Sequence, residues 1–202
     1  YLKPTVVNNV ETLSNLPWLL NNGAEAYKAY GSEASPGTRL VAVSGHVKTP
    51  GVFEIHQGTT TYRELFEDER YGGGYRDGHS LKMFIPGGAS APWFFPEDVD
   101  LPLEGRVVGA AGSMLGSGAI VVMDDSTDAV KACLRVVRFF ARESCGKGSP
   151  CREGTSWEEK ILQRIRDGQG RPSDIDLLLD VADNISPGPY PVAAAPSQGL
   201  AA

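Results

Sequence analysis

Residues 40–55 carry the clearest secondary-structure pattern in the chain: Leu40-Val-Ala-Val-Ser-Gly-His-Val-Lys-Thr-Pro-Gly-Val-Phe-Glu-Ile55. Two apolar runs, 40–43 and 52–55, flank the tripeptide Thr49-Pro50-Gly51. Pro fixes φ at the first corner of a turn, and Gly tolerates the positive φ that many turns require. The stretch therefore predicts two strands joined as a β-hairpin.

Three further elements are predicted downstream of this hairpin. Thr61-x-x-Glu64 resembles a capping box, whose side chains satisfy free backbone N–H groups, and it predicts a helix over 62–67. Leu81–Ile85 predicts a third strand. Ala119–Met123 is apolar throughout, which is typical of a strand buried on both faces, so we expect it near the centre of the sheet.

This order of elements is typical of a small α+β fold of the β-grasp (ubiquitin-like) type. Between the third and fourth strands, Val107-Val108 predicts either a short strand or a turn. An unrelated α+β sandwich is the alternative interpretation.

Helices are predicted before the hairpin. Asn9 is an expected N-cap, and the apolar spacing of Leu13, Leu16 and Leu20 marks one helical face. Pro17 predicts a kink or a division into two short helices, because it lacks a backbone N–H. A second short helix is expected over 24–30.

The last third of the chain predicts a small bundle of three helices. Ser126 is expected to cap the first helix, with Asp128 in its first turn. Thr155-x-x-Glu158 predicts the start of the second helix, and Ser173 that of the third. The loop 143–154 then lies between two helices. We expect three parts in all, over 1–36, 37–124 and 125–202.

Composition excludes several classes of protein. The net charge of −6 argues against a general nucleic-acid binder, and no apolar run reaches the length of a transmembrane helix. The first residues show no apolar secretory segment, and three cysteines do not suit a disulfide scaffold. These features predict a cytoplasmic protein that docks to others without entering the membrane. Residues 131–171 nevertheless carry ten Lys or Arg against five acids, which indicates a solvated helical face or a positive field beside an anionic cofactor or partner.

Two cysteines lie six residues apart in the loop Ser144-Cys-Gly-Lys-Gly-Ser-Pro-Cys-Arg152. In a C-x-x-C-x-x-C run three thiolates converge on one iron–sulfur cluster. Here Gly148 occupies the middle position between Cys145 and Cys151. On spacing alone, two ordinary loop cysteines are favoured over a metal site.

The wider sequence around these cysteines resembles a known family. Glu143-Ser-Cys-Gly-Lys-x-x-Pro-Cys-Arg-Glu-Gly-Thr155 is similar to the cluster loop of the FMN-bearing, NADH-oxidising subunit of respiratory complex I. The same module occurs in the diaphorase subunits of NAD-linked hydrogenases and formate dehydrogenases. Residues 3–12 resemble the flavin-side motif of that family. Residues 44–51 and 112–118 look like its β-grasp domain, called SLBB, and the strand that follows.

The resemblance implies the C-terminal part of an NADH dehydrogenase flavoprotein subunit, which passes electrons from NADH through FMN to iron–sulfur centres. Residues 1–36 would be a helical remnant of the FMN- and NADH-binding domain, followed by the SLBB-like domain and the cluster-bearing bundle. Val7, Asn8, Asn9 and Thr12 are carried over as FMN contacts. Most of the FMN and NADH site belongs to an upstream domain, so this chain alone is expected not to oxidise NADH. Its expected partners are that domain and other subunits of the dehydrogenase.

In the family, a 4Fe–4S cluster is held by C-x-x-C-x-x-C and a distant cysteine after the last helix. Cys145 and Cys151 match the first and third positions, whereas Gly148 and Val192 stand where the other two ligands are expected. Neither Gly nor Val offers a side-chain ligand, so we predict that the chain binds no stable 4Fe–4S cluster. Cys133 lies on an apolar helical stripe and is expected to be a core residue.

Two other functions remain open on the sequence. The chain could be a cluster-free structural or interaction module of the dehydrogenase, or the SLBB-like part could bind a small ligand. No catalytic residues are expected. His46, His56 and His79 show no metal-binding spacing. Asp124, Asp125 and Asp128 are explained more simply by helix capping than by a cation site.

Overall fold

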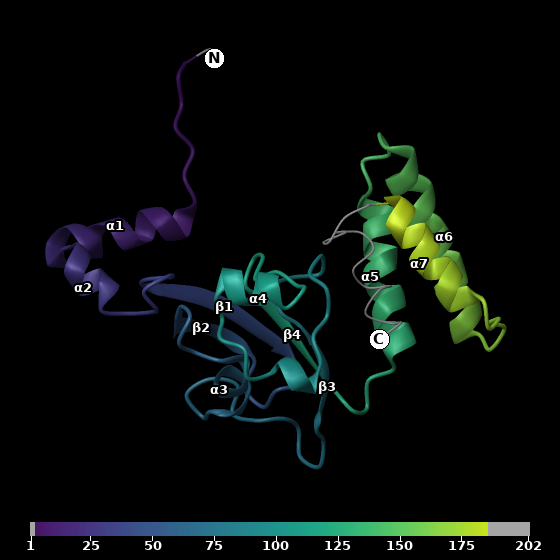
Figure 1. Cartoon of the computed structure of the whole chain (residues 1–202), viewed down its shortest axis with the longest axis horizontal. Coiled ribbons are helices and arrows are strands. Elements are labelled where there is room, and N and C mark those ends of the chain that lie inside the picture. Colours follow the sequence, from purple (N-terminus) through teal and green to yellow (C-terminus); the bar gives the residue numbers. More distant parts are fainter. Residues whose placement is uncertain (1–2, 186–202) are drawn as a thin grey trace.

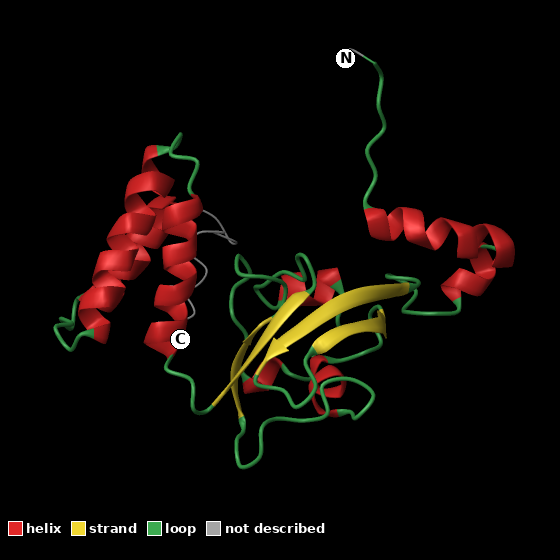
Figure 2. Cartoon of the chain, turned by 180° about the vertical axis from the view of Figure 1, so that it is seen from behind, coloured by secondary structure: helices red, strands yellow, loops and turns green. Residues whose placement is uncertain are grey.

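A four-stranded mixed sheet forms the centre of the computed structural model, which describes residues 3–185. The strands are β1 (Thr38–Gly45), β2 (Gly51–His56), β3 (Leu81–Ile85) and β4 (Ala119–Asp124), in the order β2-β1-β4-β3. β1 is antiparallel to β2 and parallel to β4, while β3 is antiparallel to β4 (Figure 2). The predicted hairpin and third strand are confirmed, and β4 lies inside the sheet as expected.

One face of the sheet is covered along its whole width. The other face is covered only along β3 and β4, since alternate residues of β1 and β2, such as Leu40 and Val52, are exposed. A first core cluster joins Val41 and Val43 of β1 and Phe84 of β3 to the helices on one face. These are α3 (Tyr62–Glu67) and α4 (Gly105–Ala110). A short 3-10 helix, Pro96–Asp98, precedes α4.

The helix over 62–67 has the predicted bounds, and Thr61 caps it through a hydrogen bond from the Glu64 backbone N–H (3.1 Å). The expectation of a strand or turn at Val107-Val108 is wrong, because both residues lie in α4. Val108 is fully buried in the first core cluster. Burial of this side chain outweighs the β propensity of the Val-Val pair.

The helical bundle consists of α5 (Ala129–Glu143), α6 (Ser149–Arg166) and α7 (Asp174–Ile185) (Figure 1). A second core cluster contains residues of the other face of β3 and β4 together with residues of all three helices. Its members include Met83, Ile85, Met123, Cys133, Leu134, Ile161 and Leu178. The bundle is therefore joined to the sheet by apolar contacts, and Cys133 is a core residue as predicted.

Two predicted helix starts in the bundle are wrong. Asp128 caps α5 by accepting a hydrogen bond from the Lys131 N–H (3.0 Å), so Ser126 is not the cap. α6 begins at Ser149 instead of near Thr155. Pro150 suits the first turn of a helix, where a backbone N–H has no intrahelical partner.

The N-terminal helices are α1 (Val10–Asn22) and α2 (Ala24–Lys28). Asn9 caps α1 as predicted, accepting a hydrogen bond from the Glu11 N–H (2.8 Å). Of the two outcomes predicted at Pro17, the division into two short helices is wrong, because α1 continues through it as one helix. No residue of α1 is buried, so water can solvate the backbone carbonyl that Pro17 leaves without a donor. Within residues 3–185, no helix is long and apolar enough to cross a membrane.

Gly45 closes β1 at a position that admits no side chain. Its φ is +87°, and a Cβ would overlap the Val122 carbonyl oxygen of the neighbouring strand. We expect Gly45→Ala to lower the free energy of unfolding by roughly 3 kcal/mol, from backbone strain and steric overlap together. Urea denaturation measures this loss.

Gly112→Ala is the matched control for this substitution. Gly112 has a nearly identical φ of +88°, but nothing lies within 4 Å of an added Cβ. This variant is expected to lose only about 1 kcal/mol, the cost of positive φ for Ala. Equal losses in the two variants would contradict the proposed overlap with Val122.

Candidate functional site

The cysteine loop lies at one end of the bundle, between α5 and α6. Cys145 is exposed in the loop, and Gly148 is the N-cap of α6. Cys151 is the third residue of that helix and is half-buried. The start predicted for α6 near Thr155 would leave Cys151 in an irregular loop, whereas helical backbone fixes its position.

Hydrogen bonds within the loop hold its shape. The Arg152 guanidinium donates to the Gly146 carbonyl (2.5 Å), and the Gly146 N–H donates to the Ser144 hydroxyl (3.3 Å). The Ser144 hydroxyl also lies 3.6 Å from the Cys151 sulfur. Gly146 has a φ of +73°, which favours glycine and lets the chain reverse here. These contacts connect both ends of the loop to each other.

The side chains near the loop do not fit a 4Fe–4S cluster. Among the described residues, no group of three converging Cys, His, Asp or Glu ligands contains Cys145 or Cys151. Gly148 contributes no ligand, although its φ of −90° and the open space around it would accept a side chain. Val192, where a fourth ligand is expected, lies outside the described residues.

Gly154 brings α7 close to the start of α6. A Cβ on Gly154 would stand 2.5 Å from Cγ1 of Ile185 and 3.6 Å from Cγ1 of Val181. The missing side chain therefore allows the end of α7 to pack one helical turn beyond Cys151. The glycine of the Arg-Glu-Gly-Thr motif thus has a packing role in this bundle.

The four residues assigned to the flavin lie far from the cysteines. Val7 and Asn8 belong to the exposed segment that precedes α1, Asn9 caps the helix, and Thr12 lies exposed in its first turn. Figure 1 shows α1 and the cysteine loop on opposite sides of the sheet. Glu11 accepts a hydrogen bond from the Leu40 N–H (2.7 Å), which fixes the start of α1 to β1. The residues assigned to FMN therefore lie at the start of α1, apart from the cysteines at the end of the bundle.

A third polar cluster forms where β4 leads into α5, and it surrounds the buried carboxylate of Asp124. The Arg76 guanidinium donates to Oδ2 (2.7 Å), the Ser126 hydroxyl donates to Oδ1 (2.6 Å), and His46 Nδ1 lies 2.9 Å from Oδ1. Burial by itself would raise the pKa of Asp124. The hydrogen bonds from Ser126, Arg76 and His46 outweigh it and hold the pKa below its ordinary value.

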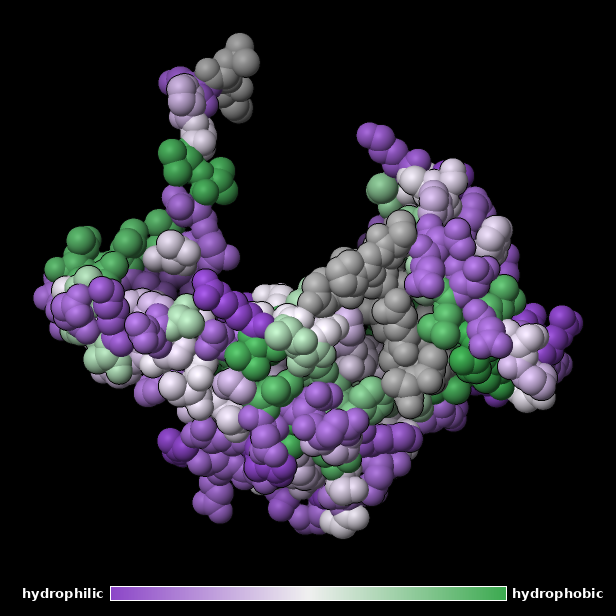
Figure 3. All heavy atoms as spheres, in the orientation of Figure 1, coloured by the Kyte–Doolittle hydropathy of each residue, from purple (hydrophilic) through white to green (hydrophobic). Residues whose placement is uncertain are grey.

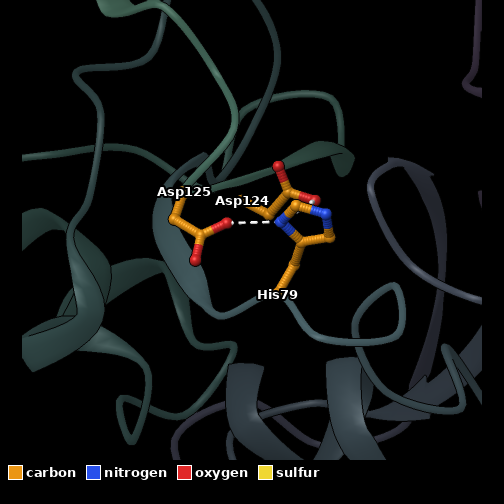
Figure 4. Close-up of side chains that lie close together, drawn as sticks. All are labelled: His79, Asp124 and Asp125. Carbon is orange, nitrogen blue, oxygen red and sulfur yellow. Dashed lines mark hydrogen bonds and ion pairs between the residues drawn. The ribbon is translucent and has the colours of Figure 1, made fainter.

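His79 and Asp125 extend this cluster and are 37% and 50% exposed. Figure 4 shows both side chains beside Asp124. His79 Nδ1 lies 2.6 Å from Asp125 Oδ1, and His79, Asp124 and Asp125 offer ligand atoms within 4.8 Å of one another. The Arg76 guanidinium already neutralises Asp124, which disfavours a cation at this position. The arrangement is therefore an ion-pair network that ties the segments around His46, Arg76 and His79 to the end of β4.

Sequence reasoning missed this network. Helix capping was expected to explain Asp124, Asp125 and Asp128, and only Asp128 caps α5. His46, Arg76 and His79 approach Asp124 from segments more than forty residues away in sequence. No local pattern marks contacts of that range.

Comparisons with known proteins identify the family of this chain. Residues 131–189 match the model of a family described as the NADH-ubiquinone oxidoreductase-F iron-sulfur binding region. The F subunit of the NADH-quinone oxidoreductase of Streptomyces coelicolor is 48% identical over 186 residues, which are 92% of this chain and 40% of that protein. The Escherichia coli counterpart is 43% identical over 194 residues, which are 96% of this chain and 43% of that protein.

A solved structure shares the fold. The crystal structure of an NAD+-reducing [NiFe]-hydrogenase in the H2-reduced state superposes with a TM-score of 0.80 at 30% identity. The match covers 98% of this chain and 33% of that chain. Fold and cysteine loop together define the class as the iron–sulfur region of NADH-linked oxidoreductases. Within that class, the chain belongs to the family of the NADH-quinone oxidoreductase F subunits and aligns with their C-terminal portion. It spans about two fifths of the length of the curated relatives.

Proposed function

We propose that this chain is the C-terminal part of an NADH dehydrogenase flavoprotein subunit, which passes electrons from NADH through FMN to iron–sulfur centres. The observation that carries the proposal is the 48% identity to the S. coelicolor relative over 92% of the chain. In this role residues 1–36 complete the FMN- and NADH-binding domain, residues 37–124 form an SLBB-like β-grasp domain, and residues 125–202 form the bundle. The central parallel pair β1–β4 between antiparallel neighbours supports the β-grasp assignment.

FMN would meet this chain at the start of α1. Val7, Asn8 and Thr12 are exposed there, and backbone N–H groups at the start of a helix favour a phosphate or another electron-rich group. Asn9 already caps α1 through its side-chain oxygen, so its side-chain amide N–H is the group available to a flavin. FMN bound there would carry the hydride chemistry, and this chain would position one side of it.

The same proposal includes the loss of stable cluster ligation. Two thiols, on Cys145 and Cys151, are the cysteine ligands that the described loop retains. A 4Fe–4S cluster is ordinarily held by four thiolates, so half of its ligands would come from elsewhere. No electron-transfer step is therefore assigned to Cys145 and Cys151.

A cluster-free structural module of the dehydrogenase is the second candidate. The self-supporting hydrogen bonds of the loop, from Arg152 to Gly146 and from Gly146 to Ser144, favour it. A diaphorase subunit of an NAD-linked hydrogenase is also supported, because an NAD+-reducing hydrogenase shares the fold. In each case the partners would be other subunits of the assembly and the upstream nucleotide domain. The location would be the cytoplasmic side of the membrane, at its periphery.

The exposed apolar face of α1 supports docking to that upstream domain. Leu13, Leu16 and Leu20 recur at helical spacing and are all exposed, Leu20 by 82%. Figure 3 shows hydrophobic side chains gathered over α1. We expect this chain to co-purify, with bound FMN, with the part of the S. coelicolor relative that this chain does not match. Leu13→Glu combined with Leu20→Glu should abolish co-purification, because two carboxylates would be buried at the contact.

Leu177→Glu is the matched control, since Leu177 is 42% exposed on α7, which lies on the other side of the sheet from α1 (Figure 1). It should leave co-purification unchanged. If the α1 double variant bound the upstream part as well as the unchanged chain does, α1 would not be the docking face. If the unchanged chain bound neither that part nor FMN, the flavoprotein role itself would fail.

A further inference from the structure

A second candidate site lies between the N-terminal helices and the hairpin, remote from the cysteine loop. An open cavity of about 430 Å³ is lined by residues of α1, α2, β1 and β2. Its volume is within the size range of small-molecule sites. Its walls include three aromatic rings, of Trp18, Tyr27 and Tyr30, and the imidazole of His56. The carboxylate of Glu54 stands beside them.

The rings stand at steep angles to one another instead of stacking flat. Trp18 lies 6.3 Å from Tyr27 and 6.0 Å from Tyr30 between ring centroids, with interplanar angles of 58° and 68°. Tyr30 lies 5.4 Å from the His56 ring at 63°. Trp18 and Tyr30 remain 40% and 41% exposed. Aromatic surface is therefore available to a ligand from more than one direction.

Backbone hydrogen bonds connect the segments that border this pocket. The Gly37 N–H donates to the Tyr30 carbonyl (2.7 Å), and the Ser32 N–H donates to the Gln57 carbonyl (2.8 Å). Gly37 has a φ of +93°, and a Cβ there would overlap the ring of Tyr27. The glycine therefore lets that ring pack against the start of β1. A pre-formed site loses less entropy on binding than one that must be assembled.

Glu54 supplies a charge that no cation in the described chain neutralises. Its Oε1 accepts a hydrogen bond from the Thr38 hydroxyl (2.6 Å). Among residues 3–185, it forms no ion pair with a Lys, Arg or His side chain. A carboxylate next to aromatic faces is the chemistry that attracts an organic cation, because the ring faces carry negative electrostatic potential.

We propose that this pocket binds a small organic cation of the quaternary ammonium class. The rings of Trp18 and Tyr30 contact the methyl groups, whose positive charge is spread over an apolar surface. Glu54 provides the opposite charge without requiring an N–H donor from the ligand. This site is independent of FMN, of the cluster loop and of the proposed dehydrogenase role.

Choline and 3,3-dimethyl-1-butanol test the proposal, because they have nearly the same shape and differ in charge. Each is titrated into the full 202-residue chain at pH 8, and amide shifts are followed by two-dimensional NMR. We expect choline to shift the amides of Trp18, Tyr30 and His56 and to bind about tenfold more tightly than the neutral alcohol. Equal affinities, or no shifts with choline at these residues, would overturn the proposal.

Two variants separate the contribution of the Glu54 charge to choline binding from that of the Trp18 aromatic ring. Glu54→Gln keeps the shape of the side chain and should weaken choline binding about fivefold or more, with no change for the alcohol. Trp18→Leu keeps an apolar wall and should likewise weaken choline binding selectively. Glu69→Gln removes an equal charge from an exposed position outside the pocket and should change neither affinity. Unchanged choline affinity in Glu54→Gln and Trp18→Leu would sink the assignment, even if one variant were less stable.

Discussion

Gly148→Cys combined with Val192→Cys is expected to turn a chain that retains little iron into one that holds about four irons after anaerobic reconstitution. The reason is the number of thiolates, which rises from the two of Cys145 and Cys151 to the four that a 4Fe–4S cluster requires. Gly148 accepts the change readily, because its φ is −90° and nothing lies within 4 Å of an added Cβ. Iron and labile-sulfide analysis, with EPR of the reduced sample, provides the measurement.

Three control variants test whether the iron binding depends on thiolates placed at the cysteine loop. Cys145→Ser added to the double variant should remove most of the iron, because it withdraws one thiolate. Gly148→Cys alone should give an intermediate, less stable loading. Gly112→Cys, which adds a thiol at an exposed turn away from the loop, should give none. A near-stoichiometric cluster in the unmodified chain would contradict the prediction and would restore electron transfer at Cys145 and Cys151.

Asp124→Asn is expected to lower the free energy of unfolding by about 3 kcal/mol at pH 7. The Asp124 side chain is 0% exposed and holds Arg76, His46 and Ser126 at the junction of β4 and α5. An amide keeps the volume but cannot accept the same set of hydrogen bonds, so it leaves donors unpaired inside the protein. Chemical denaturation at neutral pH measures the loss.

The pH dependence gives the second part of this test. The folded state lowers the pKa of Asp124 below its unfolded value, near 4, so its stabilisation is fully present above that value. It is lost as the pH falls below about 4, through the folded pKa. The stability difference between the unchanged chain and Asp124→Asn should therefore shrink from pH 6 to about pH 3.

Asp125→Asn is the matched control for the buried carboxylate. Asp125 is half-exposed, and its partners His79 and Ser80 lie at the surface of the same network. Its loss should be much smaller than that of Asp124→Asn, because exposed ion pairs contribute little. Losses of equal size would show that burial of Asp124 is not what makes the network stabilising.

Local sequence signals predicted most elements of the sheet correctly. The cap at Thr61 depends on interactions within a few residues, and the apolar runs 40–43, 52–55 and 119–123 mark strands through adjacent residues. The predicted turn at Thr49-Pro50-Gly51 is wrong, because Gly51 already belongs to β2 and the Lys48 and Thr49 N–H groups donate to the distant Gly74 and Gly72 carbonyls. Signals of this kind lie in neighbouring residues of the sequence. The strands of the hairpin, α3 and β4 could therefore be predicted without coordinates. The family of the cysteine loop was also identified from adjacent residues.

The errors occur where tertiary contacts outweigh local preference. Val107-Val108 forms a helix because Val108 enters the core, and α6 begins before Thr155 because Pro150 and the packing of α5 and α7 favour an earlier start. The continuity of α1 through Pro17 depends on its exposure. None of these environments can be inferred from neighbouring residues alone.

The sequence by itself determined the family, the sheet-forming segments and the count of cysteines in the loop, because each depends on residues that are adjacent in the chain. The tertiary structure alone decided the Asp124 network and the aromatic pocket beside Glu54. Both assemble side chains from distant segments, and their charges and rings meet only after β1, β2 and β4 are paired. Contacts of that kind arise from chain topology, which sequence spacing does not encode.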